Sequence, residues 1–189
     1  MRYLILLFFM LSGFAVTARN FVAFVNVDSA VSLDLLHSIV TNDLRAIISV
    51  DGRVLSETTI SIADLVNTTA KGYPSGNRQL SVYLVNSTNF PPQVVIPQYA
   101  SIINVRGLNK NSTEKLYRER IRKVILKGLA FSCGFGATME SGTCVMGLGS
   151  FDSLKGIDET SDSYSPFCFF PLEKYLNQRK LMWIDPAFE

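Results

Sequence analysis

The pattern of apolar and polar positions predicts three strands and a first helix between residues 21 and 105. The segment 21–27 (FVAFVNV) is a short apolar run of strand length, and 79–85 and 99–105 have the same character. Apolar residues recur at helical spacing after the first strand, at Leu33, Leu35, Leu36, Ile39, Val40, Leu44 and Ile47. Ser32 stands where a helix cap is expected.

The connections between these elements are less regular. Asp51-Gly52 is expected to form a tight turn, because this dipeptide is typical of turns. The segment 60–66 fits a helix or a strand equally well. The pattern therefore leaves the middle of the chain open.

A long helix from Glu114 to Phe131 is the clearest predicted element. Asn111 and Glu114 have the spacing of a capping box. An apolar stripe with the period of a helix follows, formed by Tyr117, Ile121, Val124, Ile125, Gly128 and Leu129. The order strand, helix, strand, strand and then a long helix predicts an α/β fold.

Composition and charge indicate one globular domain without an obvious charged partner. The 189 residues are 48% apolar and 18% charged, which suffices for a sizeable core, and the net charge is only +2. Basic residues gather on the predicted long helix, at Arg118, Arg120, Arg122 and Lys123. Glu114 and Glu119 lie four residues before Arg118 and Lys123, a spacing that favours ion pairs along a helix. We interpret this cluster as a solvated helix face rather than a nucleic-acid-binding surface.

The N-terminus has the pattern of a secretory signal. Residues 1–18 contain Arg2, an apolar run over 4–16 and small residues up to Ala18. This run is shorter than the ~20 residues that span a bilayer. We expect cleavage after Ala18 and a single domain over 19–189, located outside the cell or in the secretory lumen, with no stable membrane span.

Three Asn-x-Ser/Thr sequons agree with this route. They begin at Asn67, Asn86 and Asn111. One sequon alone arises easily by chance, but three in a chain with a signal segment predict a glycoprotein.

Four short motifs occur in order from the end of the long helix onward. They are Gly134, Cys144-Val145-Met146, Ser153-Leu154-Lys155-Gly156-Ile157-Asp158 and Phe167-Cys168. This order resembles the archaemetzincins, whose zinc motif H-E-x-x-H-x-x-G-x-x-H is followed by C-x-M, S-L-x-x-[IV]-D and C-x-x-C. The likeness covers residues 99–176 well and residues 20–98 only in the order of elements. It retains Gly134, Met146 and Asp158, and it implies a metzincin-like domain with a mixed sheet and a long helix leading into the zinc-site frame.

The residues that bind zinc and activate water in that frame are missing from this chain. The three histidine positions fall on Lys127, Phe131 and Ala137, and the glutamate position falls on Gly128. The resemblance therefore implies a pocket formed by Lys127, Phe131 and Ala137 above Met146, without metal, cofactor or catalytic base. We expect Phe131 to fill the place of the metal and Lys127 to reach out of it. Restoring the zinc site would take at least histidines at these three positions and Gly128→Glu.

The family's cysteines are also incomplete in this chain. In the archaemetzincins four of them resemble a structural zinc site, but the first position falls on or beside Thr138 and the last on Pro171. Only Cys144 and Cys168 remain, so structural zinc is not expected. In an oxidising compartment the two remaining thiols of such a site are expected to form a disulfide, with Cys133 as the unpaired thiol. The pairing Cys133–Cys144 stays open.

The favoured function is a secreted, archaemetzincin-like pseudoprotease whose cleft binds an unknown peptide or protein. Two alternatives stay open. The first is an active hydrolase with an unrecognised site, in which Cys133 would be the nucleophile and His37, the single histidine, its base. No nucleophile-elbow pattern surrounds Cys133, and we favour a buried or disulfide-bonded cysteine. The second alternative is a structural or adhesive secreted domain unrelated to metzincins.

Overall fold

The computed structural model describes six parts of the chain, namely residues 20–57, 78–88, 92–96, 99–139, 144–147 and 153–184. The expected signal segment, the ambiguous segment 60–66 and the sequon at Asn67 lie outside these ranges.

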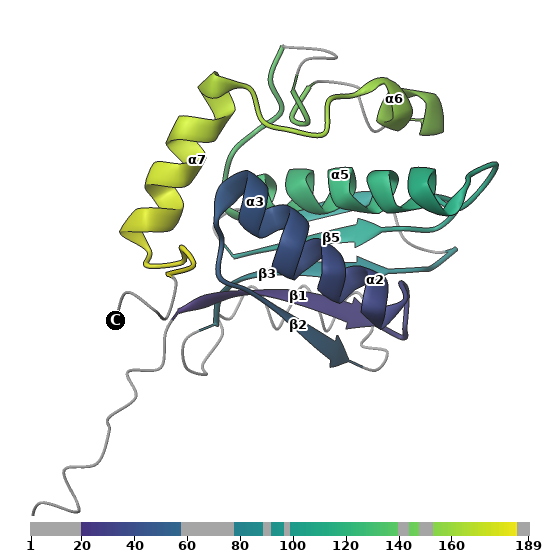
Figure 1. Cartoon of the computed structure of the whole chain (residues 1–189), viewed down its shortest axis with the longest axis horizontal. Helices are drawn as coiled ribbons and strands as arrows, with labels where there is room; N and C mark the ends of the chain where they lie inside the picture. The colour runs from purple at the N-terminus through teal and green to yellow at the C-terminus, as the bar shows by residue number, and fades with distance from the viewer. Residues whose placement is uncertain are drawn as a thin grey trace, which may run out of the picture.

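A five-stranded mixed sheet forms the centre of the domain (Figure 1). Its strands are β1 (Phe21–Val27), β2 (Gly52–Glu57), β3 (Arg78–Val85), β4 (Gln93–Ile96) and β5 (Ala100–Asn104). They lie in the order β2-β1-β3-β5-β4. The pairs β1–β2, β1–β3 and β3–β5 are parallel, whereas β4 runs antiparallel to β5 at one edge. The predicted α/β class with a mixed sheet is confirmed.

Helices cover one face of this sheet. They are α2 (Leu33–Ser38), a π-helical stretch η1 (Ile39–Leu44), α3 (Arg45–Ile48), α5 (Glu114–Ser132), α6 (Leu154–Glu159) and α7 (Pro166–Gln178). Figure 1 shows the α2–α3 run and α5 side by side on the sheet, with α6 above α5 and α7 across one end. None of the helices in the described ranges is long and apolar enough to cross a membrane.

Strand β1 is buried on both of its faces. Its side chains alternate between the faces, so Val22 and Phe24 belong to the core beneath the helices. Ala23, Val25 and Val27 belong to a second apolar cluster on the opposite face. This double burial explains why β1 reads as a nearly continuous apolar run.

Two strands were not predicted from the sequence. β2 begins at Gly52, where a tight turn was expected, and pairs in parallel with β1. A Cβ at Gly52 would lie 2.7 Å from Cγ1 of Val40 and 2.8 Å from Cε2 of Phe24. Glycine is therefore needed for close packing rather than for a turn. β4 has only four residues and lacked a distinct pattern.

Both ends of α5 are defined by specific hydrogen bonds. The side chain of Thr113 accepts a hydrogen bond from the amide of Leu116 at 3.2 Å, so the N-cap is Thr113 and the prediction of a capping box from Asn111 is wrong. At the other end Gly134 has φ +90°, its amide donates to Phe131 O, and the next amide, that of Phe135, donates to Ala130 O. This is a Schellman motif, and it explains why a glycine stands at position 134.

The basic cluster of α5 is not a solvated face, contrary to expectation. Arg118 pairs with Asp43 at 2.9 Å, from the η1 stretch, instead of with Glu114. Arg122 pairs with Asp162 at 2.5 Å, in the segment after α6. These partners are distant in sequence, so helical spacing could not reveal them.

The remaining two basic residues of the cluster fasten α6 to α5. Arg120 is 3% exposed and holds both carboxylate oxygens of Asp158 at 2.7 Å, and it also donates to the carbonyls of Leu108 and Lys110. Lys123 donates through Nζ to the carbonyls of Ile157 and Asp158 at 2.9 and 3.1 Å. We call this set of contacts the α5–α6 clasp.

The last part of α5 lies very close to the sheet at Gly128. The hydroxyl of Ser101 in β5 donates to the carbonyl of Gly128 at 2.8 Å. A Cβ at this position would lie 2.9 Å from the Ser101 oxygen and closer still to Cδ1 of Ile103. Position 128 therefore faces the sheet. The glutamate that a restored zinc site would require at this position does not fit there.

We predict that Gly128→Glu lowers the free energy of unfolding by more than about 3 kcal/mol. The substitution overpacks the contact with Ile103 and places a carboxylate in a buried interface. Urea unfolding followed by circular dichroism measures the change. Gly136→Ala is the matched control, because a Cβ at Gly136 meets nothing within 4 Å. Equal stability of the Gly128→Glu variant and the wild type would contradict the close packing.

We also predict that Asp158→Asn lowers the free energy of unfolding by about 2 kcal/mol at pH 7, because it removes a charge-assisted pair with a buried arginine. The hydrogen bonds from Arg120 hold the pKa of Asp158 below its usual value, although partial burial opposes this shift. A carboxylate whose pKa is lower in the folded than in the unfolded state stabilises the folded protein at pH values above its unfolded pKa, about 3.9. The difference between wild type and variant should therefore vanish as the pH falls below about 4 and through the folded pKa.

Asp162→Asn is the control for this measurement. Asp162 is 56% exposed in its ion pair with Arg122, so we expect less than about 1 kcal/mol. Equal effects of the two substitutions, or a difference for Asp158→Asn that persists unchanged in acid, would contradict the role assigned to the clasp.

Candidate functional site

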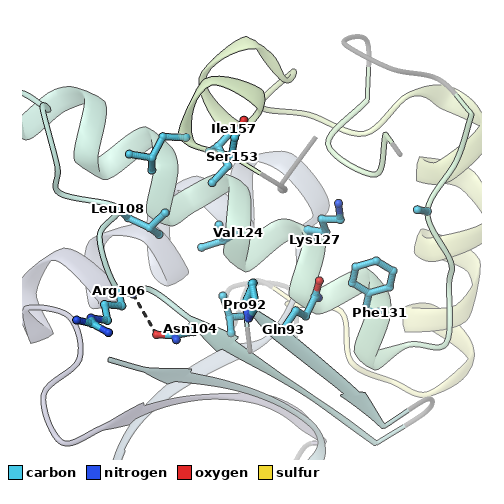
Figure 2. A pocket seen from close by; sticks show the side chains of 13 residues that line it. Pro92, Gln93, Asn104, Arg106, Leu108, Val124, Lys127, Phe131, Ser153 and Ile157 are labelled. Carbon is cyan, nitrogen blue, oxygen red and sulfur yellow. Dashed lines mark hydrogen bonds between the residues drawn. The ribbon is translucent and has the colours of Figure 1, made fainter. Parts of the chain in front are cut away.

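A cavity of about 510 Å³ opens between α5, α6 and the β4–β5 edge of the sheet (Figure 2). Its described lining is mostly apolar and consists of Pro92, Gln93, Ile103, Asn104, Arg106, Leu108, Val124, Lys127, Phe131, Ala137, Ser153, Leu154 and Ile157. The volume lies in the range of small-molecule and peptide pockets.

The cavity brings together three of the four residues of the zinc-site frame. Lys127 and Phe131 reach it from successive turns of the last part of α5, and Ala137 reaches it from the segment after the Gly134 turn. The fourth, Gly128, packs against the sheet instead. Met146 was expected to form the floor of this pocket. It is buried, but it is not among the described residues that line the cavity.

Lys127 does not extend into solvent, contrary to expectation. It is only 6% exposed, and its Nζ lies 5.7 Å from the centroid of the Phe131 ring. An ammonium at this distance from an aromatic face is attracted by the ring's negative quadrupole. Lys127 is therefore a buried cation in the wall of the cavity, with the Phe131 ring as its neighbour.

The turn after β5 places a second cation at the cavity. The Asn104 side chain donates to the carbonyl of Ser87 at 2.8 Å and accepts from the amide of Arg106 at 3.2 Å. These bonds fix the turn that carries Arg106, as the dashed line in Figure 2 shows for the second of them. Arg106 itself is exposed.

The frame residues do not fit a zinc ion. Zinc in proteins is bound by thiolates, imidazoles and carboxylates. Lys127, Phe131 and Ala137 supply an ammonium, a phenyl ring and a methyl group instead, and the positive charge of the ammonium would repel the metal. Within the described ranges no three His, Cys, Asp or Glu residues gather as a metal site. The single histidine, His37, is exposed on α2.

Cys144 contacts Cys168 in the first turn of α7. Their sulfurs are 3.4 Å apart, a contact distance without a disulfide bond, and both cysteines are buried. Burial raises the pKa of Cys144, but the hydrogen bonds from the amides of Ser165 and Met146 and the hydrogen bond with the Cys168 thiol lower it by more, so its pKa lies below the usual value. Cys144 is thus disposed to form a thiolate next to a second thiol.

Cys133 has the opposite character. It caps the C-terminal end of α5, is 4% exposed, and burial raises its pKa to about 12 despite contrary contributions from Ser132 and Arg179. A thiol with this pKa is protonated at neutral pH and is a poor nucleophile. The expectation of a buried Cys133 is confirmed, and the hydrolase alternative built on it gains no support.

Sequence reasoning overlooked most of the cavity wall. The S-L-x-x-[IV]-D segment was noted as a motif, but Ser153, Leu154 and Ile157 prove to form the side of the cavity that α6 contributes. The i, i+3 spacing of Leu154 and Ile157 could have indicated one apolar face. For Gln93 the sequence held no signal, because β4 itself was not predicted.

Comparisons with known proteins agree with the fold. No family model matches the sequence, and no similar protein was found among curated sequences. The crystal structure of an archaemetzincin from Methanopyrus kandleri is similar, with a TM-score of 0.66 over 87% of this chain and 99% of that chain at 16% sequence identity. The chain therefore has an archaemetzincin-like fold.

Proposed function

We propose that the protein is a secreted, non-catalytic archaemetzincin-like protein whose cleft binds an extended peptide segment. The observation that carries this proposal is the cavity beside the edge strand β4.

The position of β4 favours an extended ligand over a compact one. β4 is the last strand of the sheet, and Gln93 at its start lines the cavity together with Ile103 of β5. An edge strand presents main-chain donors and acceptors to which a peptide can add as a further strand. The apolar cavity next to it can take one or two side chains of that peptide.

Peptide hydrolysis is not expected at this site. A zinc peptidase needs a metal to polarise the carbonyl and a base to activate water. The frame supplies Lys127 and Gly128 where the first ligand and the base would stand. Retention of an accessible cleft without these groups favours binding as the function.

The secretory route is supported by sequence and exposure together. The N-terminal segment has the pattern of a secretory signal. Asn86 follows β3 and Asn111 precedes α5, and both are exposed, so glycans at these two sequons would not disturb the core.

We predict that the protein secreted by eukaryotic cells binds peptides without cleaving them. A pool of fluorescently labelled random decapeptides should bind measurably by fluorescence anisotropy and remain intact by mass spectrometry, with or without EDTA. Elemental analysis should find clearly less than one zinc per chain. Ala137→Trp should weaken binding at least about tenfold, because the indole occupies space in the cavity that the peptide needs.

Asn177→Trp is the control, since Asn177 is exposed on α7 and does not line the cavity. Chelator-sensitive cleavage, or one tightly bound zinc per chain, would contradict the non-catalytic part of the proposal. Absence of binding, or equal effects of the two tryptophans, would contradict peptide binding in the cleft.

We further propose that Cys144 and Cys168 form a disulfide in the secreted protein. Their sulfurs are already in contact at 3.4 Å, and the lowered pKa of Cys144 favours the thiolate that disulfide formation requires. The bond would link the 144–147 turn to α7 across a sequence separation of 24 residues. In the chain-entropy model such a loop contributes about 3 kcal/mol.

Peptide mapping of the non-reduced, secreted protein tests this pairing. We expect a Cys144–Cys168 cross-link and one protected thiol at Cys133. Cys144→Ser should lower the free energy of unfolding of the oxidised protein by about 3 kcal/mol, while the same substitution should have a smaller effect in reductant. A free Cys168, or a Cys133–Cys144 cross-link, would overturn the proposed pairing.

A further inference from the structure

The described residues that line the cavity carry charge of only one sign. Its described lining includes two basic residues, Lys127 and Arg106, and no aspartate or glutamate. In Figure 2, Lys127 and Phe131 lie at one end of the cavity and Arg106 at the other, with Val124 between them. A bound ligand therefore meets positive charge at either end and apolar surface in the middle.

The burial of Lys127 makes its charge effective. Exposed cations are screened by water and salt, but Lys127 is only 6% exposed. Electrostatic interactions are stronger in such a partly desolvated site than at the surface. The Phe131 ring centroid lies 5.7 Å from this ammonium, a distance at which an aromatic face attracts a cation.

A carboxylate is the group that complements this end of the cavity. An ammonium has three N–H donors, so a ligand carboxylate can add to the contacts that Lys127 makes within the protein. Hydrogen bonds between two charged groups are roughly twice as strong as those between neutral ones. A basic ligand group would instead face Lys127 or Arg106 at like charge.

The apolar middle of the cavity limits the position of that carboxylate within a peptide ligand. Leu108, Val124 and Ile157 would contact an apolar side chain of the ligand. An acidic residue next to an apolar residue, or a C-terminal carboxylate after one, satisfies both parts of the cavity. Both sources present the same chemistry to Lys127.

We infer that the peptide bound in this cleft is acidic, and that one of its carboxylates pairs with Lys127 while an adjacent apolar side chain occupies the cavity. This inference rests on the proposed peptide binding and adds the charge and composition of the ligand.

Four pools of fluorescently labelled hexapeptides test the inference on the full secreted protein. Three pools have an amidated C-terminus and differ at the third position, which is Asp or Glu in the acidic pool, Asn or Gln in the neutral pool, and Lys or Arg in the basic pool. The fourth pool has Asn or Gln at the third position and a free C-terminal carboxylate. The other positions are drawn from Val, Leu, Ser and Thr. We expect one or both of the carboxylate pools to bind about tenfold tighter than the neutral amidated pool, and the basic pool to bind weakest. The two carboxylate pools distinguish a side-chain carboxylate from a terminal one.

Substitutions of Lys127 connect the preference to this residue. Lys127→Met removes the charge but keeps an unbranched side chain beside Phe131, so the preference for carboxylate should disappear. Lys127→Arg keeps the charge and should retain the preference. Lys174→Met is the matched control, because Lys174 is exposed on α7 outside the cavity lining. Thermal unfolding of each variant establishes that it is folded.

The possible outcomes separate the inference from the proposed function. Equal binding of all pools, or a carboxylate preference that persists in Lys127→Met, overturns the inference and leaves peptide binding intact. Absence of binding by every pool overturns peptide binding, and the inference with it. A preference that is lost in Lys127→Met and retained in Lys127→Arg and Lys174→Met supports the inference.

Discussion

The close contact between α5 and the sheet at Gly128 determines where the other parts of the site lie. Without a side chain at this position, α5 approaches β5 until the Ser101 hydroxyl bonds to the helix backbone. The face of α5 that carries Val124 and Lys127 is then held above the β4–β5 edge, where the cavity opens. A larger residue at position 128 would lift the helix and change the depth of the cavity.

Helix α5 also holds α6 through buried polar contacts. Arg120 and Lys123 would be costly to bury alone, but each donates to several oxygen atoms in and around α6. These contacts place Ile157 and Leu154 over the cavity. One helix therefore links the sheet and the α6 wall, and the cavity lies between the two.

The frame positions at the cavity carry Lys127, Phe131 and Ala137 instead of zinc ligands. A zinc ion would attract a ligand carbonyl and generate hydroxide, whereas the ammonium of Lys127 can attract a carboxylate but supplies neither a Lewis acid nor a base. Such an arrangement suits recognition of an acidic segment. Cys144 and Cys168 are not among the described residues that line this cavity; Cys168 lies in the first turn of α7, and the two sulfurs are 3.4 Å apart.

The sequence alone determined β1, the extent of α5 and the glycine turn at Gly134, because each depends on local pattern: a run buried on both faces, a 3.6-residue period and a left-handed backbone position. It also indicated that Lys127, Phe131 and Ala137 share one place, since their spacing matches a known frame. The tertiary structure alone decided that Gly52 begins a parallel strand, that β4 forms an edge, and that Arg120 and Lys127 are buried. These features depend on contacts between residues far apart in the chain, and a charged residue reads as exposed until the partner or the ring that covers it is known.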